Sequence, residues 1–115
     1  MQYTAHCNYI PKFVSAILKA KLIVKYGIDT RPDVIIGKGL RFVHLGGIVI
    51  HGSSVIGSNF TCLNNVTIGQ RTRRNLGVPI IGDNVFIGAY SMILGAVKIG
   101  DCVAVDAKQL IENDI

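Results

Sequence analysis

One aliphatic column constrains the fold of this chain more than any other feature of its sequence. A β-branched aliphatic residue recurs at every sixth position, at Ile81, Ile87, Ile93, Ile99, Val105 and Ile111. A single strand has a side-chain period of two and does not explain this spacing. A three-sided coil does, because each face then contributes one short strand, one corner and one inward residue. The spacing therefore predicts stacked coils, which form a parallel β-helix.

The six-residue period extends toward the N-terminus. It continues at Ile50, Ile56, Cys62 and Ile68, and more weakly at Thr30, Ile36, Phe42 and Ile48. A glycine follows the column residue at Gly37, Gly57, Gly69, Gly82, Gly88 and Gly100. We expect a positive φ or a close approach of two backbones at these corners. A second column, two residues earlier, is broken by Ser54, Pro79 and Ser91. A β-sandwich is the alternative, but its turns recur at about 8–12 residues and do not hold a six-residue phase.

The chain divides into a short N-terminal segment and one repeat domain of the all-β class. Residues 28–115 are expected to form roughly four to five coils. Residues 1–27 carry apolar residues at helical spacing, with Pro11 near the beginning and Gly27 just after the end. We predict a helix that caps the open end of the coils, and binding of this basic helix to a membrane surface is the alternative. The phase breaks at residues 42–47 and 70–79, and the second break is predicted to form a loop.

The basic residues are unevenly distributed along a chain of net charge +5. Lysines cluster between residues 12 and 25, and Arg71, Arg73 and Arg74 lie in the predicted loop. Clustered cations favour an anionic partner. The sequence lacks a helix-turn-helix pattern, zinc-finger spacing and interleaved aromatic residues, which argues against nucleic acid. A phosphate-rich small molecule fits the arginine loop better.

The three cysteines, Cys7, Cys62 and Cys102, have no paired spacing. Cys62 falls in the apolar column, where a free thiol acts as a small hydrophobic group. The N-terminus lacks the pattern of a signal peptide. These features favour a reducing, cytoplasmic location. No set of histidines and carboxylates has a convincing metal spacing, and we assign no metal.

Among the histidines His6, His44 and His51, His44 has the most informative position. It lies beside the first phase break, and Asp29 precedes it by 15 residues. One coil takes about 18 residues, so the two side chains are expected on nearly the same face, one layer apart. A carboxylate bound to imidazole Nδ1–H would leave Nε2 free as a general base for a hydroxyl. The alternatives are a surface histidine at a corner, and His51 as the base.

Five segments of the chain resemble the serine acetyltransferase branch of the hexapeptide-repeat acyltransferases. They are YGIDTRP at 26–32, IGKGL at 36–40, HLGGIVI at 44–50, NVTIG at 65–69 and PIIGDNVFIGA at 79–89. The resemblance covers residues 26–112. It implies a left-handed parallel β-helix, an exception to the usual right-handed crossover. The pattern is similar to that of the short members associated with capsule or exopolysaccharide synthesis, which acetylate sugar hydroxyls.

The resemblance also implies the participants in the reaction. They are acetyl-CoA as the co-substrate, and a homotrimer whose active sites are shared between adjacent subunits. His44 matches the family's catalytic base and Asp29 its partner. The positions expected to contact CoA are Gly69, Arg71, Arg73, Gly88, Ala89, Ala107 and Lys108. The positions expected to contact substrate are Gly46, Gly47 and Asn65, and a backbone N–H at residues 45–47 is expected to hold the oxyanion.

Two departures from the family pattern bear on the acceptor. Val43 precedes His44 where the family has an aspartate, and Gly77 and Val78 precede Pro79 where the family has an arginine and a histidine. In the family the missing residues help to hold the charged groups of the amino acid. We therefore expect an acetyl-CoA-dependent O-acetyltransferase, and we favour a sugar hydroxyl of a polysaccharide precursor over L-serine as the acceptor. The main alternative is a non-catalytic β-helix scaffold subunit. A carbonic anhydrase of the same fold would need more zinc-binding histidines.

Overall fold

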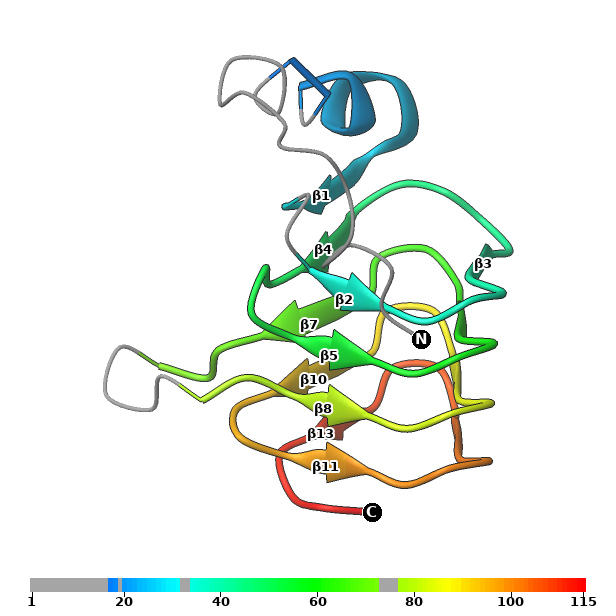
Figure 1. Cartoon of the computed structure of the whole chain (residues 1–115), viewed down its shortest axis with the longest axis vertical. Coiled ribbons are helices and arrows are strands. Elements are labelled where there is room, and N and C mark those ends of the chain that lie inside the picture. Colours follow the sequence, from blue (N-terminus) through cyan, green and yellow to red (C-terminus); the bar gives the residue numbers. More distant parts are fainter. Residues whose placement is uncertain (1–16, 19, 32–33, 73–76) are drawn as a thin grey trace.

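The repeat region is a three-sided prism of parallel strands (Figure 1). The computed structural model describes residues 17–18, 20–31, 34–72 and 77–115. Sheet A contains β1 (Ile28–Thr30), β4 (Ile48–Ile50), β7 (Thr67–Gly69), β10 (Met92–Leu94) and β13 (Leu110–Ile111). Sheet B contains β2 (Ile35–Ile36), β5 (Val55–Ile56), β8 (Ile80–Ile81) and β11 (Lys98–Ile99). Sheet C contains β3 (Arg41–Phe42), β6 (Thr61–Cys62), β9 (Phe86–Ile87) and β12 (Ala104–Val105).

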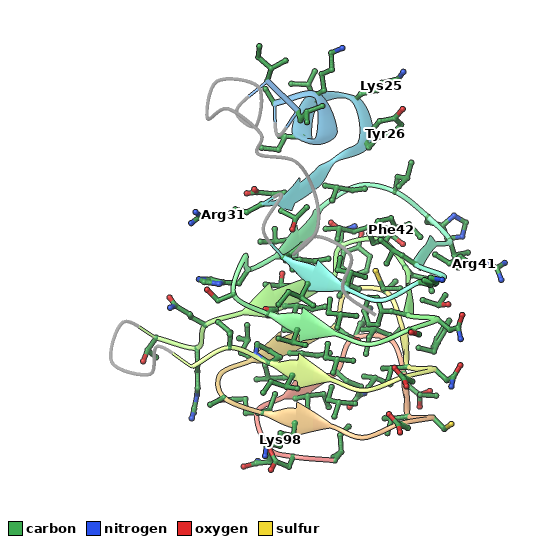
Figure 2. All side chains as sticks on the ribbon, in the orientation of Figure 1. Lys25, Tyr26, Arg31, Arg41, Phe42 and Lys98 are labelled. Atoms are coloured by element: carbon green, nitrogen blue, oxygen red, sulfur yellow. The ribbon has the colours of Figure 1, made fainter. Side chains whose placement is uncertain are left out.

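The predicted aliphatic column forms the core of the prism. In sheet A the register stacks Thr30, Ile50, Ile68, Ile93 and Ile111. In sheet B it stacks Ile36, Ile56, Ile81 and Ile99, and in sheet C it stacks Phe42, Cys62, Ile87 and Val105. Most members of the stack are buried, including Ile99 and Val105. The partly buried members are those of the first coil, Thr30, Ile36 and Phe42, and the last one of sheet A, Ile111. Neighbouring residues alternate, so Phe42 points into the prism and Arg41 away from it (Figure 2).

The phase assigned to Ile48 is wrong by two residues. Ile48 pairs with Ile28, and Ile50 pairs with the column residue Thr30. Ile48 therefore belongs to the second inward column, and the two additional residues lie in the connection at 43–47. The break itself lies where the periodicity placed it, but both Ile48 and Ile50 are buried isoleucines, so the column residue after the break could not be chosen from residue type alone.

Four of the six glycines that follow the column residues, Gly37, Gly57, Gly82 and Gly88, serve close packing rather than a positive φ. None of them is among the residues with positive φ in the described part of the chain. A Cβ at Gly88 would lie 2.5 Å from the backbone nitrogen of Ala107 and 2.7 Å from the carbonyl carbon of Asp106. A Cβ at Gly100 would meet only the Ile115 carbonyl oxygen, at 3.6 Å. Gly88 is therefore required by the adjacent coil, whereas Gly100 is not.

We expect Gly88→Ala to destabilise the protein by about 1–3 kcal/mol, because the clashing atoms belong to backbone and cannot rotate away. Gly100→Ala is the matched control at the same phase of the repeat, and it should leave stability unchanged or raise it by up to about 1 kcal/mol. Urea unfolding of both variants measures the difference. Equal losses in the two variants would contradict this assignment.

Eight of the residues with positive φ lie at two edges of the prism, and Gly39, Asn59, Asn84, Tyr90 and Cys102 among them follow a repeat glycine by two residues. The edge between sheets C and A, which we call the His44 edge, has Gly47, Asn65, Tyr90 and Lys108 in the left-handed region. The edge between sheets B and C, which we call the Cys102 edge, has Gly39, Asn59, Asn84 and Cys102 there. At each such residue after the first coil, the backbone N–H donates to a carbonyl of the preceding coil, at 2.7–3.1 Å. Side chains at equivalent positions therefore stack along each edge.

The helical residues that directly precede β1 lie beside it at one end of the prism (Figure 1). Residues 17–18 and 20–21 are helical, and the π-helix η2 (Leu22–Tyr26) follows them. Gly27 ends the helix with a φ of 66°, as a left-handed residue after a helix often does. Ile17 and Val24 remain 54% and 87% exposed, so the capping role stays a prediction. Residues 1–16 lie outside the described part, and no helix within it has the length and hydrophobicity to traverse a bilayer.

The second phase break leaves the prism at the corner between sheets A and B (Figure 1). Pro79 is buried, and its carbonyl accepts the Val55 N–H at 3.3 Å. The coil therefore resumes at Pro79, one residue earlier than the end expected for the loop. Arg73 and Arg74 lie outside the described residues.

Candidate active site

The connection between β3 and β4 forms an exposed turn on the His44 edge. Val43 N–H donates to the Cys62 carbonyl at 3.0 Å, and the Gly46 carbonyl accepts the Asn65 N–H at 2.8 Å. Gly47 has a φ of 64°, and a Cβ there would collide with the Asn65 side-chain oxygen. Gly46 has a φ of 111° and open space around it. The next coil thus holds both ends of the turn, and glycine is required within it.

Unpaired polar groups gather in this turn. The His44 side chain is exposed, and it forms no hydrogen bond or ion pair with any residue that the structure describes. The N–H groups of Leu45, Gly46 and Gly47 likewise have no acceptor among those residues. A free imidazole beside free amide donors can take a proton from a hydroxyl and stabilise negative charge on a nearby oxygen.

Asp29 lies on the outward face of β1 and does not contact His44 within one chain. Its neighbours Ile28 and Thr30 face the core, so the Asp29 side chain faces outward. Asp29 pairs with Val49, which follows His44 by five residues. The expected contact is not made because the two extra residues at 43–47 hold His44 on the corner, whereas Asp29 lies within the strand.

His51 lies at the other end of β4 from the His44 turn. Its Nδ1 accepts the Ser53 N–H at 3.1 Å. A neutral imidazole that accepts at Nδ1 carries its proton on Nε2, so His51 has no lone pair available to a substrate hydroxyl in this arrangement. His6 lies outside the described residues.

The residues expected to bind substrate or CoA fall into two groups. The His44 edge brings together Gly46, Gly47, Asn65, Gly88, Ala89, Ala107 and Lys108. Gly69 and Arg71 lie across sheet A, at the corner between sheets A and B. Arg71 Nε forms an ion pair with Glu112 Oε2 in the last coil. A single chain therefore separates the two groups by the width of one sheet.

The two described cysteines are free thiols in different environments. Cys62 is fully buried, and desolvation raises its pKa from 9.0 to about 12. It stays protonated, and therefore non-nucleophilic, at neutral pH. Its folded pKa exceeds that of the unfolded chain, so unfolding releases a proton as the pH rises above 9.0 and stability falls from there toward pH 12. Cys102 is exposed on the other edge. No group of three or more potential metal ligands occurs within the described ranges.

Two residues near the expected substrate-binding and CoA-binding positions, Tyr90 and Glu112, were not identified from the sequence. Tyr90 is 57% exposed on the His44 edge with a φ of 63°. The repeat phase carried a signal for it, because Asn59 and Asn84 occupy the same position two residues after a glycine. Glu112 had no such signal, since its partner Arg71 depends on the path of a segment outside the repeat.

Comparisons with known proteins agree with this architecture. Residues 79–107 match the family model described as bacterial transferase hexapeptide (six repeats). Over 106 residues the chain is 37% identical to serine acetyltransferase 4 of Arabidopsis thaliana, covering 90% of this chain and 30% of that protein. A crystal structure of Neisseria gonorrhoeae serine acetyltransferase superposes with a TM-score of 0.83 at 31% identity, covering 90% of this chain and 41% of that one. A serine acetyltransferase in complex with CoA superposes with a TM-score of 0.82 at 30% identity, covering 90% and 43%.

The chain spans less than half the length of each of these relatives. Its prism, its register and these likenesses define a left-handed parallel β-helix built from hexapeptide repeats, so the fold expected from the sequence is confirmed. Within that class, the chain is similar to serine acetyltransferases of the hexapeptide-repeat family.

Proposed function

We propose that this chain is an acetyl-CoA-dependent O-acetyltransferase that acts on a hydroxyl acceptor. The observation that carries the proposal is the exposed, unpaired His44 imidazole beside three backbone N–H groups that have no acceptor in the described structure. The names of the similar proteins, serine acetyltransferases that include a CoA complex, support acetyl-CoA as the donor and L-serine as the first acceptor to test.

In the proposed reaction, His44 removes the proton from the acceptor hydroxyl as its oxygen attacks the thioester carbonyl. An N–H at residues 45–47 donates a hydrogen bond to the carbonyl oxygen as negative charge develops on it, and one such donor contributes roughly 3 kcal/mol. Collapse of the tetrahedral intermediate breaks the carbon–sulfur bond, and the imidazolium returns its proton to the CoA thiolate. Acetyl passes directly to the acceptor, which is consistent with the protonated, buried state of Cys62.

We further propose that the active protein is a homotrimer. The outward row of sheet A carries Val49, Met92 and Leu110, which are 39%, 47% and 56% exposed, with Thr67 between the first two. Such a row favours contact with a second chain. Assembly would place the His44 edge of one subunit near the Arg71 corner of the next.

In this assembly, Ala89 and Ala107 would lie along the pantetheine arm, with Lys108, Arg71 and Arg73 near the CoA phosphates. Gly88 would act indirectly, through the coil packing described above. We place the reaction in the cytoplasm, where the free thiols of Cys62 and Cys102 would stay reduced.

A sugar hydroxyl is the second candidate acceptor because of the surroundings of His44. Val43, which precedes His44, is 40% exposed, and its uncharged side chain cannot form an ion pair with an amino-acid substrate. Gly77 and Val78 supply no cation at the end of the excursion. An uncharged acceptor such as a sugar would need neither group.

The proposal is tested by incubating the purified chain with acetyl-CoA and measuring release of the CoA thiol. L-Serine in one arm is compared with nucleotide-linked and lipid-linked sugars in others, and acceptor-dependent release in any arm supports the proposal. Thermal shift with CoA provides a check that needs no acceptor, since ligand at about 100 times its Kd adds about 2.7 kcal/mol of stability. Absence of both CoA binding and thiol release would instead indicate a non-catalytic scaffold.

A further inference from the structure

Tyr90 occupies a backbone position that suits smaller residues. On the two edges of the prism, glycine or asparagine fills five of the eight left-handed positions: Gly39, Gly47, Asn59, Asn65 and Asn84. These residues tolerate a positive φ more readily than other residues do. Tyr90, Cys102 and Lys108 fill the remaining three. A tyrosine therefore occupies this corner against the conformational preference of its backbone.

The corner directs the tyrosine ring outward. Ser91, the next residue, is fully buried, and its Oγ donates to the Asp106 carbonyl at 2.8 Å and accepts the Gln109 N–H at 3.2 Å. With Ser91 anchored inward, the Tyr90 side chain stands away from the core and is 57% exposed. The Tyr90 hydroxyl has no hydrogen-bond partner in the described portion of the chain. No hydrogen bond or ion pair of the Tyr90 side chain within that portion compensates for the unfavourable backbone.

The two edges differ in how they use their polar side chains. On the Cys102 edge, Asn59 Nδ2 donates to Asn84 Oδ1 at 3.1 Å, and the Asp83 carboxylate accepts the Ser58 N–H at 2.7 Å. These contacts serve the prism itself. On the His44 edge, the Tyr90 and Lys108 side chains form no such contact with described residues. The His44 edge therefore presents groups that are available to a ligand.

We propose that Tyr90 is a donor-binding residue whose ring forms one wall of the channel for the pantetheine arm of acetyl-CoA. Adjacent coils are about 4.8 Å apart, so Tyr90 lies about 10 Å from the His44 turn along the edge, and Lys108 lies about 14 Å from it. A thioester held at His44 would extend its arm past Tyr90 and bring its phosphates toward Lys108. An aromatic ring offers this flexible, largely apolar arm a rigid contact surface. The inference rests on the proposed function.

The test compares Tyr90→Gly with Cys102→Gly. Both substitutions relieve the same backbone strain, but only the first removes a side chain from the His44 edge. We expect Tyr90→Gly to raise the KM for acetyl-CoA about tenfold, equivalent to about 1.4 kcal/mol. Its kcat and its KM for the acceptor should stay within about twofold of wild type. Cys102→Gly should match wild type, and Tyr90→Phe should retain most of the affinity because the ring remains.

CoA affinity by calorimetry and the oligomeric state by light scattering complete the experiment. An unchanged CoA affinity in Tyr90→Gly, or an equal loss in Cys102→Gly, overturns the inference. Loss of assembly in Tyr90→Gly also overturns it, because the ring would then be an interface residue. Wild-type protein that binds no CoA overturns the proposed function and the inference with it, whereas wild-type binding with unaffected Tyr90→Gly overturns the inference alone.

Discussion

Replacing His44 with alanine should lower the turnover of acetyl-CoA by about 10²- to 10⁴-fold, the usual contribution of a positioned general base. The loss is expected in kcat, because the imidazole acts on the acceptor proton in the transition state. CoA binding should survive, since the channel residues remain. Thiol release at saturating donor measures the first effect, and calorimetry with CoA measures the second.

His51→Ala is the matched control for this experiment. His51 lies at the other end of β4, and its Nδ1 is already occupied by the Ser53 N–H. We expect this variant to retain activity within about twofold, because its ring is not placed to act as a base. Full activity in His44→Ala, or a comparable loss in His51→Ala, would show that the base has been assigned to the wrong residue.

The proposed sharing of the site between subunits adds a complementation test to the same experiment. Mixed trimers of His44→Ala and Asp29→Asn chains can assemble sites with one intact residue from each chain. If Asp29 and His44 meet across the interface, random mixing should restore about a quarter of the wild-type activity. If the two residues meet only within a chain, the mixture should be no more active than the single variants.

Replacing Ile81 with alanine should destabilise the protein by about 2–5 kcal/mol, as expected for truncating a fully enclosed isoleucine. Ile81 is 2% exposed and stacks between Ile56 and Ile99 in sheet B. The cavity would interrupt an inward column that continues through both adjacent coils. Urea unfolding at fixed protein concentration measures the loss of unfolding free energy.

Ile80 provides the control because it precedes Ile81 in the same short strand. It faces outward and is 47% exposed, so Ile80→Ala should cost less than about 1 kcal/mol. A similar destabilisation by both substitutions would contradict the inward-outward alternation of β8. It would also contradict the inward orientation of the six-residue column, on which the fold prediction depends.

Repetition explains why the core was predictable from sequence. The position of Ile81 is supported by equivalent residues in the coils on both sides, Ile56 and Ile99. The corner glycines were predicted with two possible roles, and the structure shows close packing at Gly88. The sequence correctly indicated that the corner at Gly88 needs glycine. Whether the reason was a positive φ or close packing depended on the position of the backbone in the adjacent coil.

The candidate site was less predictable because it lies where the repeat is interrupted. His44 and Asp29 were identified individually, but their separation depends on the path of the two additional residues at 43–47. The pairing of Arg71 with Glu112 depends in the same way on the route of the excursion between β7 and β8. Periodicity predicts the residues of one coil from the equivalent residues of the adjacent coils. It does not predict the path of an inserted segment, which has no equivalent in any other coil.

Along the two edges, backbone hydrogen bonds hold adjacent coils together, and the outward side chains of the His44 edge are free to contact ligands. At Asn65, Tyr90 and Lys108, the main-chain N–H holds the corner to the preceding turn, and the side chain is not needed for that bond. Substitutions at these sites should therefore alter what the edge recognises while leaving the stacked interior intact. One scaffold can thereby serve different acyl acceptors or donors through the exchange of a few outward residues.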